Sequence, residues 1–136
     1  KYEEAIVCYD KALEIDPKNF RSWWFKGSVL HDLEKYEEAI VCYDKALEID
    51  PKSESALTFK GDTLKNLKKY EEAIVCYEKA LEIEPKRYDT LTKKGNALYN
   101  LKKYEEAIVC YEKALEIEPN DKDVKEIVQT LKKHYN

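Results

Sequence analysis

The chain has 136 residues, a length typical of one domain and short for a two-lobed enzyme with a cleft between its lobes. Charged residues make up 38% of it, and only 3 Gly and 4 Pro interrupt it. This composition favours an all-α fold of solvated helices over a sandwich or barrel, which needs many turns. The formal net charge of -4 argues against nucleic acid as a partner, because phosphate binding needs clustered Lys and Arg.

The apolar residues are scattered along the chain and do not form long runs. None of the runs approaches the roughly 20 residues needed to cross a bilayer, and the amino terminus lacks the basic-then-apolar pattern of a signal peptide. We therefore expect a cytoplasmic protein that has no membrane partner.

A 34-residue interval organises the whole sequence. The segment Lys-Tyr-Glu-Glu-Ala-Ile-Val-Cys-Tyr begins at Lys1, Lys35, Lys69 and Lys103, and every Gly, Pro and Cys follows the same interval. Such a fixed period is the sequence signature of a repeat architecture.

The segment that starts each unit predicts a helix, here named helix B. Its apolar residues recur at intervals of one, three and four, as expected for a helix with two buried faces. In the second copy these residues are Ala39, Ile40, Tyr43, Ala46 and Leu47.

The next segment predicts a second helix, named helix A, in which Trp23, Leu30 and Leu33 lie at helical spacing around Gly27. Glycine inside a helix costs about 1 kcal/mol relative to alanine, so we expect these glycines to let helix B approach closely. A residue before proline disfavours the α region, so helix B ends before each Asp-Pro or Glu-Pro pair. In chain order, the predicted helices cover residues 2–15 (B), 20–33 (A), 36–49 (B), 54–67 (A), 70–83 (B), 88–101 (A) and 104–117 (B).

The tail carries one apolar stripe instead of two, formed by Val124, Ile127, Val128 and Leu131. One stripe can cover the last helix B while the opposite face stays in water. The tail is therefore predicted to be the terminal cap that repeat arrays require.

These residues resemble the tetratricopeptide repeat family. The matching signature, in order, is Trp23, Gly27, Leu30, Tyr36, Ala39, Tyr43, Ala46 and Pro51. The resemblance implies an all-α solenoid, a right-handed superhelix of antiparallel helix hairpins with about eight helices. It implies a single array over 1–136 with a half-repeat at 1–19, full repeats at 20–53, 54–87 and 88–121, and a capping helix at 122–136.

The resemblance also implies where a ligand would bind. In this family helix A lines an inner groove that holds extended segments of other proteins. The four B segments differ almost only by Asp-for-Glu exchanges, whereas the A helices share little beyond Gly and Leu, which favours recognition by the A helices. Drift after duplication would diversify them too. The inward-facing positions correspond to Arg21, Trp24, Ser28, His31, Asp32, Ser55, Thr58, Asp62, Lys65, Asn66, Asp89, Thr92, Asn96, Tyr99 and Asn100.

Within this set, Trp24 and Tyr99 are the expected anchors, because aromatic rings dominate interface energies. Neighbouring helical residues differ by about 100° in direction, so Trp23 is assigned to the core and Trp24 to the groove. The alternative for Trp24 is core packing. The amides of Asn66 and Asn96, together with that of Asn100, are expected to bond the backbone of an extended peptide.

One familiar ligand of the family is not expected. Members that bind the carboxyl-terminal peptides of heat-shock chaperones use Lys and Asn on the first helix A and basic residues on the third. Here those positions hold Trp24 and Ser28, then Asp89 and Lys93. Because only Lys93 agrees, we expect no carboxylate clamp.

Catalytic and metal chemistry are not expected either. Repeat symmetry places successive cysteines too far apart for a shared zinc ion or a disulfide, so they are interpreted as reduced packing residues. His31 and Asp32 are adjacent on a helix and do not face each other. We therefore expect no enzyme activity, no metal and no cofactor.

The sequence thus favours a scaffold that binds a protein or peptide partner in the groove of its A helices. The alternative is a homo-oligomer formed through the first helix, where Ala5, Tyr9 and Ala12 lack a preceding helix A to cover them. A duplicated or designed array without a specific ligand is a further alternative.

Overall fold

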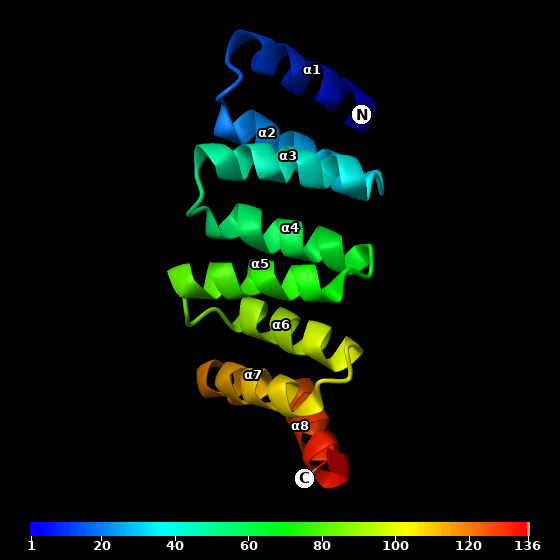
Figure 1. Ribbon diagram of the computed structural model, residues 1–136, viewed down its shortest axis with the longest axis vertical. Coiled ribbons are helices and arrows are strands. Elements are labelled where there is room, and N and C mark those ends of the chain that lie inside the picture. The colour runs from blue at the N-terminus through cyan, green and yellow to red at the C-terminus, as the bar shows by residue number, and fades with distance from the viewer. Residues whose placement is uncertain (136) are drawn as a thin grey trace.

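The computed structural model describes residues 1–135, which form eight helices and no strand, as the fold class predicts. Successive helices run antiparallel and stack along one axis, with the two ends of the chain at opposite ends of the stack (Figure 1). The helices are α1 (Tyr2–Ile15), α2 (Phe20–Asp32), α3 (Tyr36–Ile49), α4 (Glu54–Asn66), α5 (Tyr70–Ile83), α6 (Tyr88–Asn100), α7 (Tyr104–Ile117) and α8 (Lys122–Tyr135). The odd-numbered helices α1 to α7 are B helices, and α2, α4 and α6 are A helices.

Each A helix ends one residue earlier than predicted. The next residue but one, Glu34, Lys68 or Lys102, has a φ of 61 to 63°, the left-handed conformation. In the first of these turns the amide of Lys35 donates to the carbonyl of Leu30, and that of Glu34 donates to His31. This is the Schellman arrangement, which satisfies the last carbonyls of the helix and reverses the chain at once.

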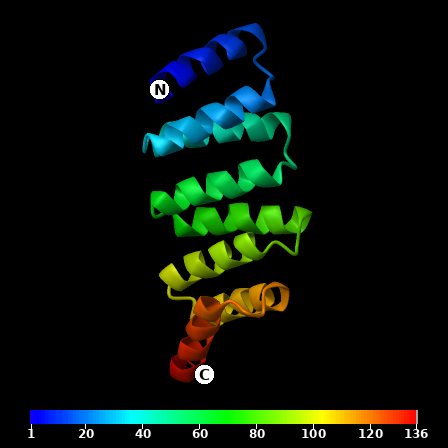
Figure 2. The same ribbon diagram turned by 180° about the vertical axis from the view of Figure 1, so that it is seen from behind.

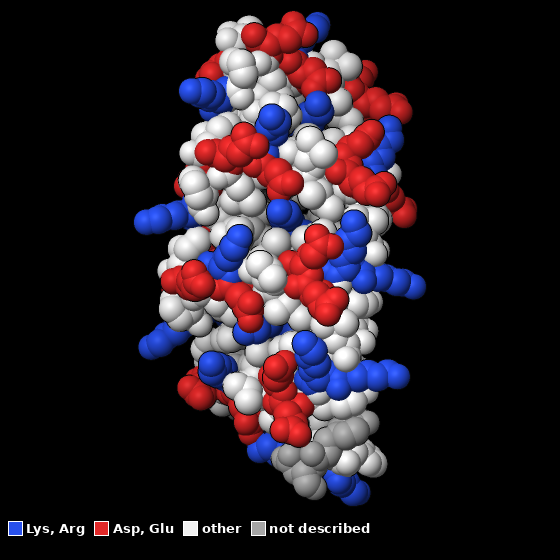
Figure 3. Space-filling view, viewed as in Figure 1, with Lys and Arg blue, Asp and Glu red and all other residues white. Residues whose placement is uncertain are grey.

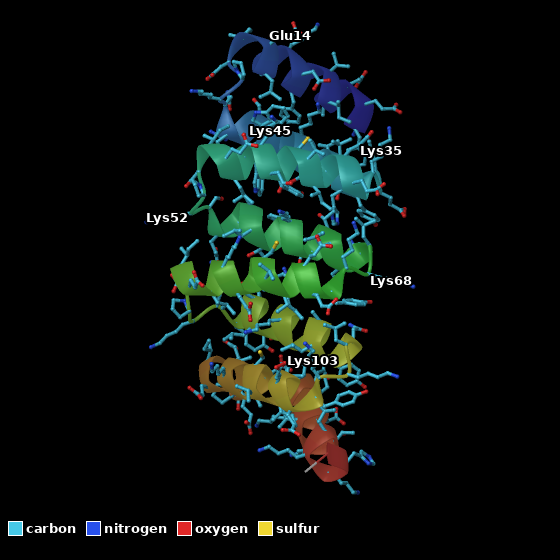
Figure 4. All side chains as sticks on the ribbon, in the orientation of Figure 1. Glu14, Lys35, Lys45, Lys52, Lys68 and Lys103 are labelled. Carbon is cyan, nitrogen blue, oxygen red and sulfur yellow. The ribbon has the colours of Figure 1, made fainter. Side chains whose placement is uncertain are left out.

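The turns from B to A lie along the opposite edge of the molecule. Figure 4 labels Lys35 and Lys68 near one edge and Lys52 near the other. Two of the three turns that lead into an A helix end in a side-chain cap. The Asn19 Oδ1 atom accepts from the amide of Ser22 at 3.1 Å, and the Ser53 Oγ atom accepts from the amide of Ala56 at 3.2 Å. The equivalent Arg87 makes no such bond.

The centre of each hairpin is a tyrosine of helix B packed beneath the glycine of helix A. Tyr43 and Tyr77 are 0% exposed, and Tyr111 is 1% exposed. A Cβ atom on Gly61 would lie 2.6 Å from the Cε1 atom of Tyr77, and the other two glycines are as confined. The glycines therefore let helix B approach closely, as expected, and it is the tyrosine rings that occupy the space beside them.

Adjoining repeats are joined by ion pairs between helix A and the preceding helix B. Lys26 reaches Asp10 at 2.6 Å, and Lys60 reaches Asp44 at 2.7 Å. The two lysine side chains are about a quarter exposed and the two aspartates about half exposed, so the lysine methylenes cover apolar surface while the ammonium groups meet a carboxylate. Exposed pairs of this kind contribute about 0–1 kcal/mol each.

The axis of α8 is steeply inclined to the axes of the other helices. It crosses behind α7 in Figure 1 and in front of it in Figure 2, and it runs steeply toward the end of the molecule. Val124, Val128 and Leu131 are buried against the cluster that contains Leu98 and Tyr111. The apolar stripe of the tail thus packs against this part of the core. Residue 136, the last of the predicted cap, lies outside the described residues.

Helix α1 is covered on one side only. Ala5, Tyr9 and Ala12 are partly exposed, whereas the corresponding residues of α3, α5 and α7 are at most 1% exposed. Leu13 is the only buried residue of this helix. An apolar strip of α1 therefore faces solvent.

The face of the molecule shown in Figure 3 carries acidic and basic side chains interspersed, without a large area of one sign. Such a surface gives a polyanion no continuous basic track. No helix among the described residues combines the length and the apolar character required to cross a bilayer.

Candidate functional site

The A helices form one face of the stack, here named the A face. Of these helices, α2 lies behind α3 in Figure 1 and in front of it in Figure 2. Every residue that the sequence assigned to the groove is at least partly exposed. The more exposed members are Arg21, Asp32, Ser55, Asn66, Asp89, Asn96, Tyr99 and Asn100. The partly buried members are Trp24, Ser28, His31, Thr58, Asp62, Lys65 and Thr92.

The buried tyrosines hold one residue of each repeat on the A face. The hydroxyl of Tyr77 donates to the Asp62 Oδ1 atom at 2.6 Å, and that of Tyr111 donates to the Asn96 Oδ1 atom at 2.6 Å. In the first repeat the Tyr43 hydroxyl lies 3.5 Å from Ser28. The scaffold thus fixes the orientation of these polar side chains, and for Asn96 it leaves the amide nitrogen as the free donor.

Both carboxylate oxygens of Asp62 accept a hydrogen bond from a side chain of the same chain. Its second oxygen accepts from the Lys93 Nζ atom at 2.9 Å, which links α4 to α6. Lys93 is the only basic residue at the positions of the chaperone-peptide clamp, and here a carboxylate of the same chain neutralises it. This pairing adds a structural reason to expect no carboxylate clamp.

His31 connects α2 to α4 and takes no part in an acid–base pair. Its Nδ1 atom lies 2.8 Å from the Thr63 Oγ1 atom, and its Nε2 atom lies 3.3 Å from the Asn66 Nδ2 atom. Its ring also meets Tyr36 edge to face. Two of the predicted peptide-binding amides are therefore already engaged within the chain, that of Asn66 with His31 and that of Asn100, whose Nδ2 atom donates to the backbone carbonyl of Asn96 at 2.9 Å.

The sequence assigned Trp23 to the core and Trp24 to the groove. In the structure both side chains are half-buried, so their burial does not separate the two roles. The Trp23 Nε1 atom donates to the carbonyl of Pro17 at 2.8 Å. Trp24 packs against the core, and its ring meets Phe25 and Phe59 edge to face.

Sequence reasoning missed the two phenylalanines of this cluster. Phe59 is 38% exposed, and Arg21 lies over the Phe25 ring, 5.8 Å from its centroid. The run of three aromatic residues at 23–25 was the available signal. The contact between Trp24 and Phe59, in contrast, depends on how α2 and α4 pack.

The A face is hollowed on both sides of Tyr99. One hollow, of about 470 Å³, lies between α4 and α6 and includes Lys65 and Asn100 in its lining. The other, of about 540 Å³, lies between α6 and α8 and includes Glu126. Asn96 and Tyr99 line both. Volumes of this size suit a side chain or a small ligand.

All four cysteines are free thiols, and they differ in accessibility. Cys42, Cys76 and Cys110 are buried, as packing residues should be, whereas Cys8 on the uncovered α1 is exposed. Burial raises the pKa of Cys42 to about 11 and also raises the pKa of Cys76 and Cys110, which disfavours the reactive thiolate. The described side chains include no group of three that would hold a metal ion.

Antiparallel helix pairs that stack at a 34-residue interval around small residues define an α-solenoid. Sequence models described as tetratricopeptide repeat match residues 25–53, 55–87 and 88–121, and another described as TPR repeat matches residues 1–33. The chain belongs to the tetratricopeptide repeat family. Among curated proteins, none matches the sequence.

Solved structures of similar shape include a crystal structure of MamA, with 23% identity and a TM-score of 0.90 over 97% of this chain and 72% of MamA. The TPR domain of Arabidopsis OM64 has 23% identity and a TM-score of 0.77, over 85% of this chain and 95% of that domain. These two likenesses concern the fold. The first TPR of Spaghetti (RPAP3), bound to the HSP90 peptide SRMEEVD, has 28% identity and a TM-score of 0.78, over 87% of this chain and 94% of that one.

Proposed function

We propose that the chain is a non-catalytic scaffold whose A face binds an extended or helical segment of another protein. The observation that carries the proposal is the exposed ring of Tyr99, 46% accessible, which stands between two hollows on the face formed by the diverse helices. The amide of Asn96, fixed by Tyr111, offers a donor beside it. An aromatic ring next to oriented polar groups is typical of a binding hot spot.

The family supports the same conclusion. The RPAP3 domain, which is similar in shape and sequence, is bound to a peptide of HSP90. We do not extend that ligand to this chain, because Trp24 and Ser28 occupy two of the clamp positions and Lys93 is paired with Asp62. The free thiols fit a reducing compartment such as the cytoplasm.

The test is a selection from a displayed library of random twelve-residue peptides, followed by binding measurements with the selected peptides. The Tyr99→Ala variant should bind them roughly 30-fold more weakly, the effect of a hot spot of about 2 kcal/mol. The matched control is Val109→Ala, an exposed side chain on a B helix, which should bind as the unaltered chain does. Equal loss in both variants, or in neither, contradicts a site on the A face.

A second candidate function is self-association through α1, and the partial exposure of Ala5, Tyr9 and Ala12 favours it. Two copies that pack these strips together would bury apolar surface that each copy exposes alone. Light scattering over a range of concentrations tests this: dimers should appear in the unaltered chain and be lost in Tyr9→Glu. A monomer at the highest concentration excludes a stable dimer.

A further inference from the structure

The two hollows beside Tyr99 carry opposite charges. The hollow between α4 and α6 is lined by Lys65 and Lys68 and by no acidic residue. The hollow between α6 and α8 is lined by Asp123 and Glu126 and by no basic residue. We name them the basic hollow and the acidic hollow.

The four charged side chains that line the two hollows form no ion pair within the described part of the chain. By contrast, Lys93, one turn before Asn96 on the same face, is paired with Asp62. Tyr99 and Asn96 lie between the two pairs, since these residues line both hollows. The opposite charges are therefore available to a ligand that reaches both hollows.

The lining between the charges is apolar or amide. On the acidic side, the partly exposed Ile127 of α8 lines the hollow together with Tyr99, so a long basic side chain can lay its methylenes on Ile127 and bring its charge to the carboxylates. On the basic side, Asn66 and Asn100 adjoin the two lysines. An acidic side chain placed there would meet the two ammonium groups and the second N–H of each amide, since the first N–H of Asn66 faces His31 and that of Asn100 donates to the carbonyl of Asn96.

We propose that this site selects a peptide segment with one acidic and one basic side chain, on either side of an apolar one. The inference rests on the proposed function, because it names the chemistry of the partner that binds there. In an extended segment alternate side chains point the same way. The acidic, apolar and basic residues therefore occupy positions one, three and five, with the apolar residue on Tyr99.

The geometry also fixes the direction of the charges. The acidic residue of the partner points toward the α4 side, into the basic hollow, and the basic residue points toward α8. The acidic hollow depends on the steep course of α8, because five of its lining residues, Asp123 to Leu131, come from that helix. Helix α8 is thus one wall of the site.

The experiment selects displayed random twelve-residue peptides on the unaltered chain and on two charge reversals, Glu126→Lys and Lys65→Glu. Peptides from the unaltered chain should be enriched in the acidic–apolar–basic pattern. Glu126→Lys should lose the preference for the basic residue and keep that for the acidic one, and Lys65→Glu should do the reverse. The matched controls are Glu82→Lys and Lys79→Glu on α5, exposed residues that line neither hollow.

Synthetic twelve-residue peptides with the core Glu-Ser-Leu-Ser-Lys give the affinities. Each charge reversal should weaken binding on the order of tenfold. Exchange of the core lysine for glutamate should restore binding to Glu126→Lys, and exchange of the core glutamate for lysine should restore binding to Lys65→Glu. Restored binding identifies which charges of the chain and of the peptide are paired. A variant that had lost its fold would not regain binding when the peptide changes.

The outcomes separate this inference from the proposed function. Selected peptides that depend on Tyr99 but have no charge pattern would overturn the inference and leave the scaffold function standing. A charge pattern that both reversals leave unchanged would overturn it as well. Failure to enrich any peptide over the Tyr99→Ala variant would overturn both.

Discussion

Each buried tyrosine joins the core to the A face through one side chain. The ring of Tyr77 fills the space beside Gly61, and its hydroxyl holds Asp62, the residue next to that glycine in sequence. The same relation links Tyr111, Gly95 and Asn96. A change in the core can therefore alter the orientation of a side chain on the binding face.

Substitution of Gly61 by alanine should destabilise the chain, although alanine is the better helix former. The gain in helix propensity is about 1 kcal/mol. The new Cβ atom would lie 2.6 Å from a tyrosine ring that is fully buried, and such overpacking costs about 1–3 kcal/mol. We expect a net loss of roughly 1 kcal/mol in urea unfolding.

The control for this prediction is the double variant Gly61→Ala with Tyr77→Leu, in which the ring that obstructs the methyl group is absent. The loss from the two changes together should be smaller than the sum of the separate losses. A stabilised single variant would contradict the close packing.

The pH dependence of stability should reveal the buried hydroxyl of Tyr111. Burial raises its pKa from the usual 10 to about 12, because the phenolate would lose its hydration. Below pH 10 both folded and unfolded chains keep the proton. Between pH 10 and 12 only the unfolded chain releases it, so the free energy of unfolding falls as pH rises.

The Tyr111→Phe variant removes this ionisation and keeps the ring. Its unfolding free energy should therefore fall less steeply than that of the unaltered chain between pH 10 and 12, by about 1–3 kcal/mol over the interval. Urea unfolding at successive pH values measures the difference. Parallel curves for the two proteins would contradict a buried hydroxyl.

At the scale of elements, the turns from A to B hold a non-glycine residue in a conformation that glycine adopts more easily. Lys102 has a φ of 63°, which costs a residue with a Cβ atom about 1 kcal/mol or more. Lys102→Gly should raise the unfolding free energy by about 0.5 kcal/mol, since part of the gain is lost to the flexibility of glycine in the unfolded chain.

The neighbouring residue supplies the matched control. Lys103 has a φ of -91°, which any residue adopts, so Lys103→Gly should lower the melting temperature while Lys102→Gly raises it. Equal effects in thermal unfolding would show that the left-handed conformation carries no cost.

The helices also show which features the sequence could predict. The bounds of the B helices are as predicted from the repeated motif and the proline that follows it, because both act through local backbone geometry. The A helices end one residue early. Glu34, Lys68 and Lys102 adopt the left-handed conformation without glycine to signal it.

The site was harder to predict than the fold. The resemblance to the family indicated which A-helix side chains share a face, and these side chains are accessible, but it could not give the ion pair of Lys93 with Asp62, which joins two repeats. The acidic hollow was missed because it depends on the course of α8. The apolar stripe of a helix predicts which side packs, whereas its crossing angle follows from side-chain contacts with its neighbours.

At the scale of the whole molecule, the clamp residues are replaced or paired, so the terminal carboxylate of a ligand should contribute little. The peptide SRMEEVD tests this, offered once as the free acid and once with an amidated end. We expect the two forms to differ less than about twofold in affinity by fluorescence polarisation, a difference below roughly 0.5 kcal/mol. A free acid that binds tenfold better would indicate a working clamp.

The one-sided support of α1 has a consequence for the order in which the array opens. In a stack where each unit touches only its neighbours, stability falls toward whichever end has the fewest contacts. Only Leu13 of α1 is buried, while α5 and α7 each bury five side chains. In a chain of residues 1–136, amide protons of α1 should therefore exchange with deuterium before those of the central helices, because α1 opens while the other helices stay folded.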